Sequence, residues 1–312
     1  MNIKYLNFYN KSESYYAQGK LNLALIYARK AEEYASDEKE LIEILYIQGL
    51  ILDETEEDDL ALEKFYKIYD LDNTQSPAVY AIAMIKEKQG LKDEAESLYK
   101  KCIDINPEYD RSYFFLANLL DNDERYEEAL YYYQKTVELV EDDFMAYNNM
   151  GAIYENLDRF DEALKVLDKS IDLNPNYFRP YFNKGVVYGR LKNIAKAVEQ
   201  YELSIEKNIE YGYNYLNLSA LYIDNDMLTN ALEILNRGIE YSSDISSDLY
   251  YNRACVYAIM GMKNCAYTNL EKAVELDKGL IEYARKDNDF SGMYNDDRFK
   301  KILGEKNDIF KN

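Results

Sequence analysis

Residues 148–164 read NNMGAIYENLDRFDEAL, and the spacing of their small and aromatic side chains decides the fold. Gly151 is followed three places later by Tyr154 and twelve places later by Ala163. Residues 182–198, FNKGVVYGRLKNIAKAV, carry the same three residue types at the same spacing, 34 residues further along the chain. A fixed period of this length indicates a repeat architecture.

The alanine of this pattern returns through most of the chain. It stands at Ala61, Ala95, Ala129, Ala163, Ala197 and Ala231 in steps of 34 residues, and Ala24 and Ala266 extend the series with steps of 37 and 35. A second small residue precedes each alanine by twelve places, and turn-like residues lie between the two, among them Gly19, Gly90, Asp158, Asp226 and Gly261. Apolar residues at i, i+3, i+4 and i+7 on both sides of the turn predict two amphipathic helices of about 14 residues in each repeat.

One helix pair cannot bury its apolar face alone, whereas stacked pairs bury it for one another, and this gives a solenoid. The pattern resembles the tetratricopeptide repeat (TPR) family, most clearly in AYNNMGAIYENLDRFDEALKVLDKSIDLNPNY and VYAIAMIKEKQGLKDEAESLYKKCIDINPEY. The resemblance implies an all-α, right-handed superhelical solenoid over residues 1–280. Eight helix-turn-helix repeats are expected to start near residues 5, 42, 76, 110, 144, 178, 212 and 247.

Residues 281–312 lack the small-residue pattern. Their sequence Asp296-Asp297-Arg298-Phe299 resembles the closing segment of many bacterial TPR chains. We expect a C-terminal cap in which Phe290, Phe299 and Leu303 face inward and shield the last repeat from water. A tail that binds a partner is the alternative.

Composition narrows the range of partners. The chain has 58 Asp and Glu against 37 Lys and Arg, a net charge of −21, so phosphate backbones and anionic lipids should repel it. The expected partner is therefore a protein or peptide, with basic segments favoured, and neither nucleic acid nor membrane. The alternative is that the acidity only keeps the chain soluble. No apolar run approaches 18 residues, and the default location is the cytoplasm.

The sequence offers little for catalysis. It has no histidine, which removes the commonest general base and the usual zinc ligand, and it has no glycine-rich phosphate loop. The acidic runs at 53–59 and 121–124 do not continue into a calcium-binding loop, so solvated turns are expected there. We therefore predict no enzyme activity, no cofactor and no metal site.

The resemblance also implies where a ligand would bind, because in this family the first helix of each repeat lines a concave groove. The sixth position of the later repeats is Asn149, Asn183, Asn217 and Asn252. Asparagines at this position form a ladder in the family, and a side-chain amide can bond both the N–H and the C=O of an extended peptide. The alternative is that these amides bond to the neighbouring helix.

A second resemblance is to the carboxylate clamp of chaperone-binding TPR domains. Three of its five positions match here, namely Asn118, Asn149 and Arg179, while Phe114 and Asn183 replace the two other basic residues. A clamp that lacks two cations should bind a terminal carboxylate weakly. A site for a single carboxylate near Arg179 and Arg190 stays open.

The N-terminal end of the expected groove is acidic and aromatic. It combines Tyr9, Tyr46 and Tyr80 with Glu13, Glu43, Asp53, Glu54 and Glu87. Tyrosine suits a binding surface because it joins a large apolar face to a hydroxyl group. We predict a scaffold that holds a peptide or partner segment in the groove. The alternative is a non-catalytic regulatory or targeting subunit of an enzyme or signalling complex. The sequence leaves the oligomeric state open.

Overall fold

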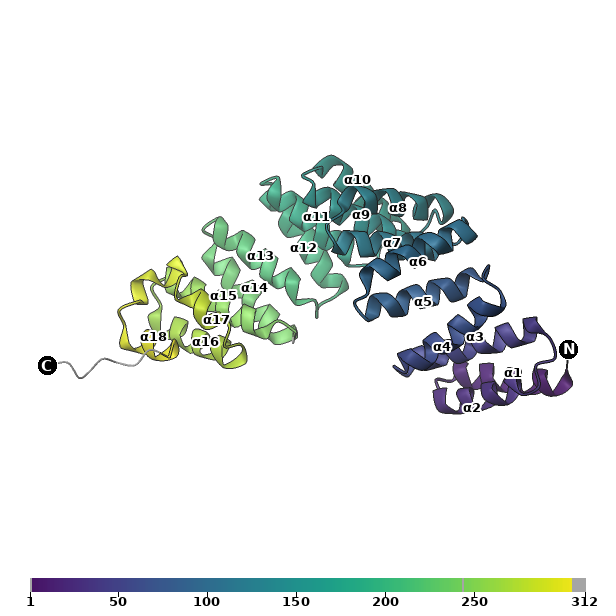
Figure 1. The fold of residues 1–312 in the computed structure, drawn as a ribbon. Coiled ribbons are helices and arrows are strands. Elements are labelled where there is room, and N and C mark those ends of the chain that lie inside the picture. Colours follow the sequence, from purple (N-terminus) through teal and green to yellow (C-terminus); the bar gives the residue numbers. More distant parts are fainter. Residues whose placement is uncertain (1, 243, 305–312) are drawn as a thin grey trace. The chain divides into compact units, whose positions relative to one another are not determined.

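A computed structural model describes residues 2–242 and 244–304, and every regular element in these two ranges is a helix (Figure 1). The chain divides into two compact units, here called the N-terminal unit (residues 1–146) and the C-terminal unit (residues 147–312). The N-terminal unit holds α1 (Ile3–Ala17), α2 (Leu21–Glu32), α3 (Glu38–Glu54), α4 (Asp58–Leu71), α5 (Ser76–Lys88), α6 (Lys92–Ile105), α7 (Asp110–Asn122) and α8 (Tyr126–Leu139).

The next helix, α9 (Phe144–Asn156), begins just before the boundary and belongs mainly to the C-terminal unit. It is followed by α10 (Phe160–Leu173), α11 (Arg179–Arg190), α12 (Ile194–Lys207), α13 (Gly212–Asp224), α14 (Leu228–Tyr241), α15 (Ser246–Ile259) and α16 (Lys263–Leu276). Three short elements close the described part: α17 (Leu280–Ala284), the 3₁₀ helix η1 (Asn288–Met293) and α18 (Asp297–Ile302). Consecutive helices pack as pairs, as the repeat pattern predicts.

The paired small residues of the pattern mark the point where two helices of a pair cross. A Cβ atom added at Gly151 would lie 2.5 Å from the side chain of Leu167, and one added at Gly185 would lie 2.7 Å from Tyr201. Ala163 is fully buried. Small residues at these positions therefore let the backbones approach closely, which explains why the 34-residue period is so regular.

Backbone geometry at the turns confirms the second part of the pattern. All five turn-like residues named above have positive φ angles, between 58° and 78°. Glycine adopts this conformation without steric cost, and asparagine and aspartate tolerate it better than other residues do. The turn can therefore end the first helix of a pair and start the second within a few residues.

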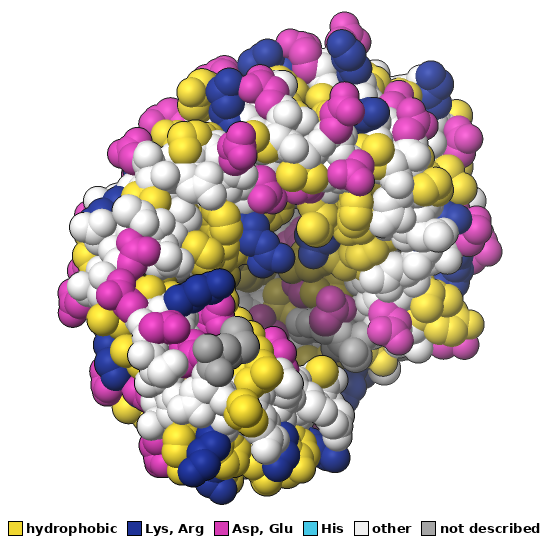
Figure 2. Space-filling model, turned by 90° about the vertical axis from the view of Figure 1, so that its right-hand side faces the viewer, with side chains coloured by type: hydrophobic (Ala, Val, Ile, Leu, Met, Phe, Trp, Pro, Cys, Tyr) yellow, Lys and Arg dark blue, Asp and Glu magenta, His cyan; other side chains and the backbone are white. Residues whose placement is uncertain are grey.

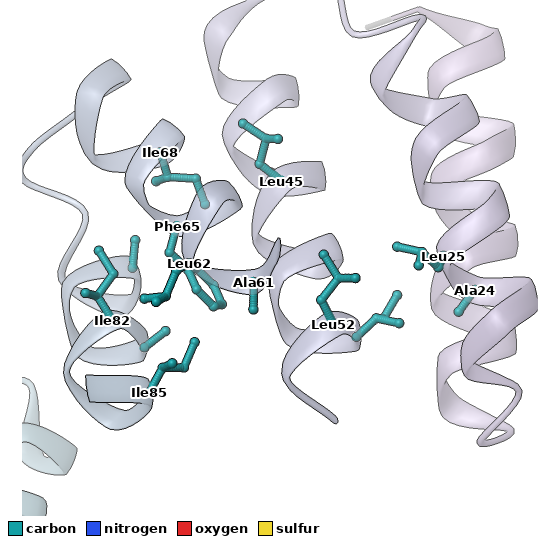
Figure 3. Close-up of a cluster of buried hydrophobic side chains, with 13 residues drawn as sticks. Ala24, Leu25, Leu45, Leu52, Ala61, Leu62, Phe65, Ile68, Ile82 and Ile85 are labelled. Atoms are coloured by element: carbon teal, nitrogen blue, oxygen red, sulfur yellow. The ribbon is translucent and has the colours of Figure 1, made fainter. Parts of the chain in front are cut away.

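The core of the N-terminal unit runs between neighbouring pairs. Buried side chains from α2, α3, α4 and α5 form one cluster, with Leu25, Leu52, Phe65 and Ile82 among its members (Figure 3). Because this cluster crosses from one pair to the next, each pair completes the apolar core of its neighbour.

Several tyrosines hold the loops between pairs. The hydroxyl of Tyr113 donates to the carbonyl of Pro107 (3.1 Å), and the hydroxyl of Tyr181 donates to Pro175 in the same way (3.1 Å). Each bond joins a helix to the loop six residues before it. The chain has 34 tyrosines, and some of them therefore have a structural role.

The end of the C-terminal unit has the packing that the capping hypothesis requires. Phe290, Phe299 and Leu303 are buried in one cluster with Ala254 and Leu270, which belong to α15 and α16. These side chains cover the apolar flank of the last helix pair. Residues 305–312, the end of the predicted cap, lie outside the described residues.

Candidate functional site

In each unit some first helices of successive pairs lie next to one another. In the C-terminal unit α11 contacts α13, and α13 contacts α15, while in the N-terminal unit α1 contacts α3. Equivalent positions on neighbouring first helices can therefore contribute side chains to one continuous surface.

Two of the asparagines in the C-terminal unit are joined by a third. The Asn183 amide donates to Oδ1 of Asn148 (3.0 Å), and the Asn148 amide donates to Oδ1 of Asn149 (3.1 Å). Asn148 is only 3% exposed, so this chain of amides links α11 to α9 from within the structure. The side-chain amide of Asn183 thus forms the bond to a neighbouring helix that the alternative hypothesis expects, and this bond uses one of its two N–H groups.

The other two asparagines are less engaged. The Asn217 amide donates to the carbonyl of Tyr213 in its own helix (2.9 Å), while the side chain of Asn252 makes no hydrogen bond with any residue of the described ranges. Both side chains are partly exposed. The amide oxygen of Asn217 can therefore accept a hydrogen bond from a ligand, and both the amide oxygen and the NH₂ group of Asn252 can bond to one.

The two candidate arginines differ sharply. Arg179 is exposed and lies over the rings of Phe178 (5.7 Å) and Tyr211 (5.9 Å). It forms no ion pair with a residue of the described ranges. Arg190 pairs with Glu155 (2.6 Å) and with Asp158, both of the preceding helix pair. The site for a single carboxylate, predicted near both arginines, therefore depends on Arg179, because Arg190 already has partners.

Asn118 belongs to the N-terminal unit and is held by the second helix of its own pair. Its side-chain oxygen accepts a hydrogen bond from the hydroxyl of Tyr133, a fully buried residue of α8. Phe114, which replaces a basic residue of the carboxylate clamp, packs against Phe115 and Tyr133. Both positions are thus tied to the aromatic packing of α7 and α8.

Tyr9 and Tyr46 line a pocket of about 510 Å³ in the N-terminal unit. The other lining residues are Glu13, Tyr16, Ala17, Glu43, Ile47 and Leu50. The side chains of Tyr9, Glu13 and Tyr16 recur at i, i+4 and i+7, so they share one face of α1. Tyr16 was absent from the sequence prediction, and this spacing is the signal that could have found it.

Tyr80 does not join this open surface. It is 7% exposed, because the rings of Tyr99, Tyr109 and Phe115 surround it at 5.5–6.1 Å. Burial raises the pKa of its hydroxyl to about 12. The prediction that Tyr80 faces a ligand in the groove needs correction, because neighbouring aromatic side chains cover it.

The acidic turns are less uniform than the sequence predicts. Between α3 and α4, Lys88 reaches back from α5 and pairs with Asp58 (2.7 Å) and Asp53 (3.9 Å). At the end of α7, burial raises the pKa of Asp121 to about 6, and no cation pairs with it within the described ranges. Asp121 thus differs from a fully solvated turn residue.

Cys255, Asp287 and Asp289 form another group that the sequence did not reveal, and their potential ligand atoms lie within 4.8 Å of one another. Hydrogen bonds within the protein account for this arrangement. Asp287 accepts from the Tyr251 hydroxyl (2.8 Å), the Cys255 thiol (3.6 Å) and the backbone N–H of Asp289 (3.0 Å). The Asp287 carboxylate thereby ties the segment after α17 to α15, which suits a structural role.

Models of the tetratricopeptide repeat match residues 76–109, 112–144, 144–177, 178–206 and 247–279, which together make up just over half of the chain. The chain belongs to the tetratricopeptide repeat family. Helices α13 and α14 fall outside these matches, yet the pattern alanine of that TPR pair, Ala231, is fully buried like its counterparts.

Solved TPR structures resemble the chain as well. YrrB, described as a TPR protein with an unusual peptide-binding site, is 25% identical; the match covers 60% of this chain and 95% of YrrB, with a TM-score of 0.50. PilF of Pseudomonas aeruginosa is 19% identical over 68% of this chain and 96% of PilF, with a TM-score of 0.55. One chain of the APC/C Cut9–Hcn1 hetero-tetramer is 16% identical, and the match covers 91% of this chain and 52% of that chain, with a TM-score of 0.59. No curated protein matches the sequence.

Charges of both signs are interspersed on one face of this TPR chain. Figure 2 shows Asp and Glu side chains scattered over the face in view, with Lys and Arg side chains between them. Among the described residues, no helix combines the length and the apolar character needed to cross a membrane.

Proposed function

We propose that this TPR protein is a non-catalytic scaffold that holds an extended peptide, or an extended segment of a partner protein, against the first helices of its repeats. The observation that carries the proposal is Arg179, an exposed arginine without an ion pair in the described ranges of a chain whose net charge is −21. Acidic groups are abundant in the chain, yet the Arg179 guanidinium lies over two aromatic rings and pairs with none of the described carboxylates.

The neighbouring side chains suit a peptide. Asn217 and Asn252 have amide groups that can pair with backbone N–H and C=O groups regardless of the peptide's side chains. Arg179 can add a charge-assisted bond to an acidic side chain or a C-terminal carboxylate of the same peptide. The likeness to YrrB, itself described as having a peptide-binding site, supports this use of the fold. A location in the cytoplasm stays a prediction.

The proposal can be tested by capture of partners from the native cell, with identification by mass spectrometry. The wild-type chain, the Arg179→Ala variant and a Lys169→Ala control serve as baits. Lys169 is exposed on α10, a second helix, and has no ion pair in the described ranges, so its loss removes the same charge from a different face. We expect a set of proteins that Arg179→Ala loses and Lys169→Ala keeps.

Equal capture by all three baits would contradict the proposed site. The identities of the captured proteins also separate the scaffold from its alternative, since a regulatory or targeting subunit should retain one enzyme or one signalling complex as its main partner.

A further inference from the structure

The pocket lined by Tyr9 and Tyr46 lies between two successive first helices of the N-terminal unit. Helix α1 contributes Tyr9, Glu13, Tyr16 and Ala17, and helix α3 contributes Glu43, Tyr46, Ile47 and Leu50. Each group recurs at helical spacing, so each is one face of its helix. The pocket is therefore a product of the repeat geometry and belongs wholly to the N-terminal unit.

Two of the three tyrosine hydroxyl groups in this pocket donate to carboxylates. Tyr9 donates to Oε1 of Glu13 (3.1 Å), and Tyr16 donates to Glu54, the last residue of α3. Burial, and then these hydrogen bonds, raise the pKa of each tyrosine to about 12, so both stay neutral. Negative charge thus resides on the carboxylates while the tyrosine rings form uncharged walls.

None of the described residues that line this pocket is a lysine or an arginine. The Nζ of Lys39, whose side chain is 85% exposed, lies 3.9 Å from Glu43, and the charge of Arg111 acts on Tyr46. An exposed pair of this kind contributes little, because water screens it. Glu13 is exposed and the Glu43 side chain is 38% exposed, so a cationic group of a ligand can reach both carboxylates from the solvent.

A second pocket in the same unit makes the contrast clear. It has a volume of about 460 Å³ and is lined by Asp53, Met84, Glu87, Lys88 and Phe115. Its own wall supplies Lys88, which pairs with Asp58 and Asp53. In this second pocket a lining lysine offsets the charge of nearby carboxylates, whereas the described lining of the Tyr9–Tyr46 pocket supplies no such cation.

We propose that the pocket formed by Tyr9, Glu13, Tyr16, Glu43 and Tyr46 binds a cationic side chain, arginine or lysine, of the partner peptide. This inference rests on the proposed function, since the ligand is part of a partner, but it names a different site. Carboxylates attract the charge, and neutral tyrosine faces add cation–π attraction to a group held over them. The net charge of −21 favours the approach of a basic segment at low salt.

The test uses the full chain and a defined probe, a short fluorescein-labelled peptide of alternating glycine and arginine. A matched peptide carries citrulline, which has nearly the same shape but no charge. The pocket variant is Glu13→Gln with Glu43→Gln. The control variant is Glu33→Gln with Glu63→Gln, which removes two exposed carboxylates of the same unit that do not line the pocket.

In fluorescence anisotropy we expect the arginine peptide to bind more tightly than the citrulline peptide. The pocket variant should weaken binding of the arginine peptide about tenfold or more, and the control variant about twofold or less. Equal binding of the two peptides would overturn the inference, and so would equal binding by the pocket and control variants.

The outcome is separable from that of the proposed function. The arginine peptide reports on the N-terminal unit alone, whereas the loss of captured partners on Arg179→Ala reports on the C-terminal unit. If Arg179→Ala has no effect on capture while the pocket variant loses the arginine peptide, only the proposed function of the C-terminal face fails.

Discussion

The two units of this TPR protein share one packing pattern and present different chemistry on their first helices. In the N-terminal unit, glutamates and tyrosines line a pocket between α1 and α3. In the C-terminal unit the first helices carry Asn183, Asn217 and Arg179, and Arg179 has no ion pair with another described residue. The small and large residues that lock each helix pair are the same in both, as Gly49 against Phe65 and Gly151 against Leu167 illustrate.

This comparison separates two kinds of position. Residues at the helix crossings are fixed by steric fit, so the repeat can be recognised from them wherever it occurs. Positions on the exposed face of a first helix are not needed for packing, so they can change charge from one unit to the other without cost to the fold. Function has to be argued from these positions, because the fold alone does not name a ligand.

The largest effect is expected from removal of residues 281–312. Phe290, Phe299 and Leu303 would leave the apolar flank of α15 and α16 exposed, and each buried side chain of this size contributes about 1.5–3 kcal/mol. The truncated chain should therefore unfold at a lower temperature and associate through the exposed flank. Light scattering and a thermal melt measure the two effects.

Hydrogen exchange should show that this loss falls on α15 and α16 and spares α1 to α4, since stability in repeat proteins passes mainly between neighbours. A truncated chain that stays monomeric and equally stable would show that the segment is not a cap.

The next effect concerns the C-terminal face. Hydrogen bonds to charged groups contribute about 1.5–3 kcal/mol, against roughly 1 kcal/mol for neutral ones. Arg179→Ala should therefore weaken binding of a captured partner more than Asn183→Ala does, especially since one N–H of Asn183 already serves Asn148. Titration calorimetry at two salt concentrations measures both, and added salt should narrow the difference. The reverse order of the two variants would show that the amides dominate binding.

A steric change should affect both units alike. Ala163 and Ala95 are fully buried at the same position of two repeats, one in each unit. Ala163→Leu and Ala95→Leu should each lower the free energy of unfolding by about 1–3 kcal/mol through overpacking. Urea denaturation provides the measurement. An unchanged midpoint for one of the two variants would mean that its unit does not use this crossing as the other does.

Much of the fold could be predicted from the sequence because its signals are local and repeated. The 34-residue step of the alanines, the small residues at the crossings and the turn residues such as Gly90 and Asp158 each report one steric requirement. A requirement that returns several times along the chain is hard to mistake. The segment after residue 280 carries no repeat, but its apolar Phe290 and Phe299 still marked the buried side.

The candidate site could be predicted less completely, because exposure depends on neighbours far away in sequence. Tyr80 occupies a groove position, yet Tyr99, Tyr109 and Phe115 cover it. Arg190 carries a charge that suits a ligand, yet residues more than 30 positions earlier already pair with it. Side-chain partners of this kind leave no periodic signal in a single sequence.

The smallest effect concerns one groove position in two successive repeats, and its sign should differ between the units. Asp121 in the N-terminal unit has a pKa raised by burial from 3.8 to about 6 and has no cationic partner within the described ranges. Its counterpart 34 residues later is Glu155 in the C-terminal unit, which pairs with Arg190 at 2.6 Å. The charged form of Asp121 is thus destabilised by burial in the folded state, whereas the charged form of Glu155 is stabilised by its ion pair with Arg190.

The pH dependence follows from the direction of the Asp121 shift. Because the folded state holds this proton more tightly, Asp121 favours folding most below its unfolded pKa of 3.8, and this contribution declines as the pH rises through about 6. Asp121→Asn should therefore raise stability near pH 7 by about 1 kcal/mol, a value discounted for the solvent that still reaches the side chain, and should change little below about pH 4. Glu155→Gln should instead lower stability near pH 7 by up to about 1 kcal/mol, because it leaves Arg190 with a weaker partner. Thermal melts of both variants across this pH range would decide the matter. If both substitutions shift the melting temperature in the same direction near pH 7, the ion pair with Arg190 does not make Glu155 differ from Asp121 in its effect on stability.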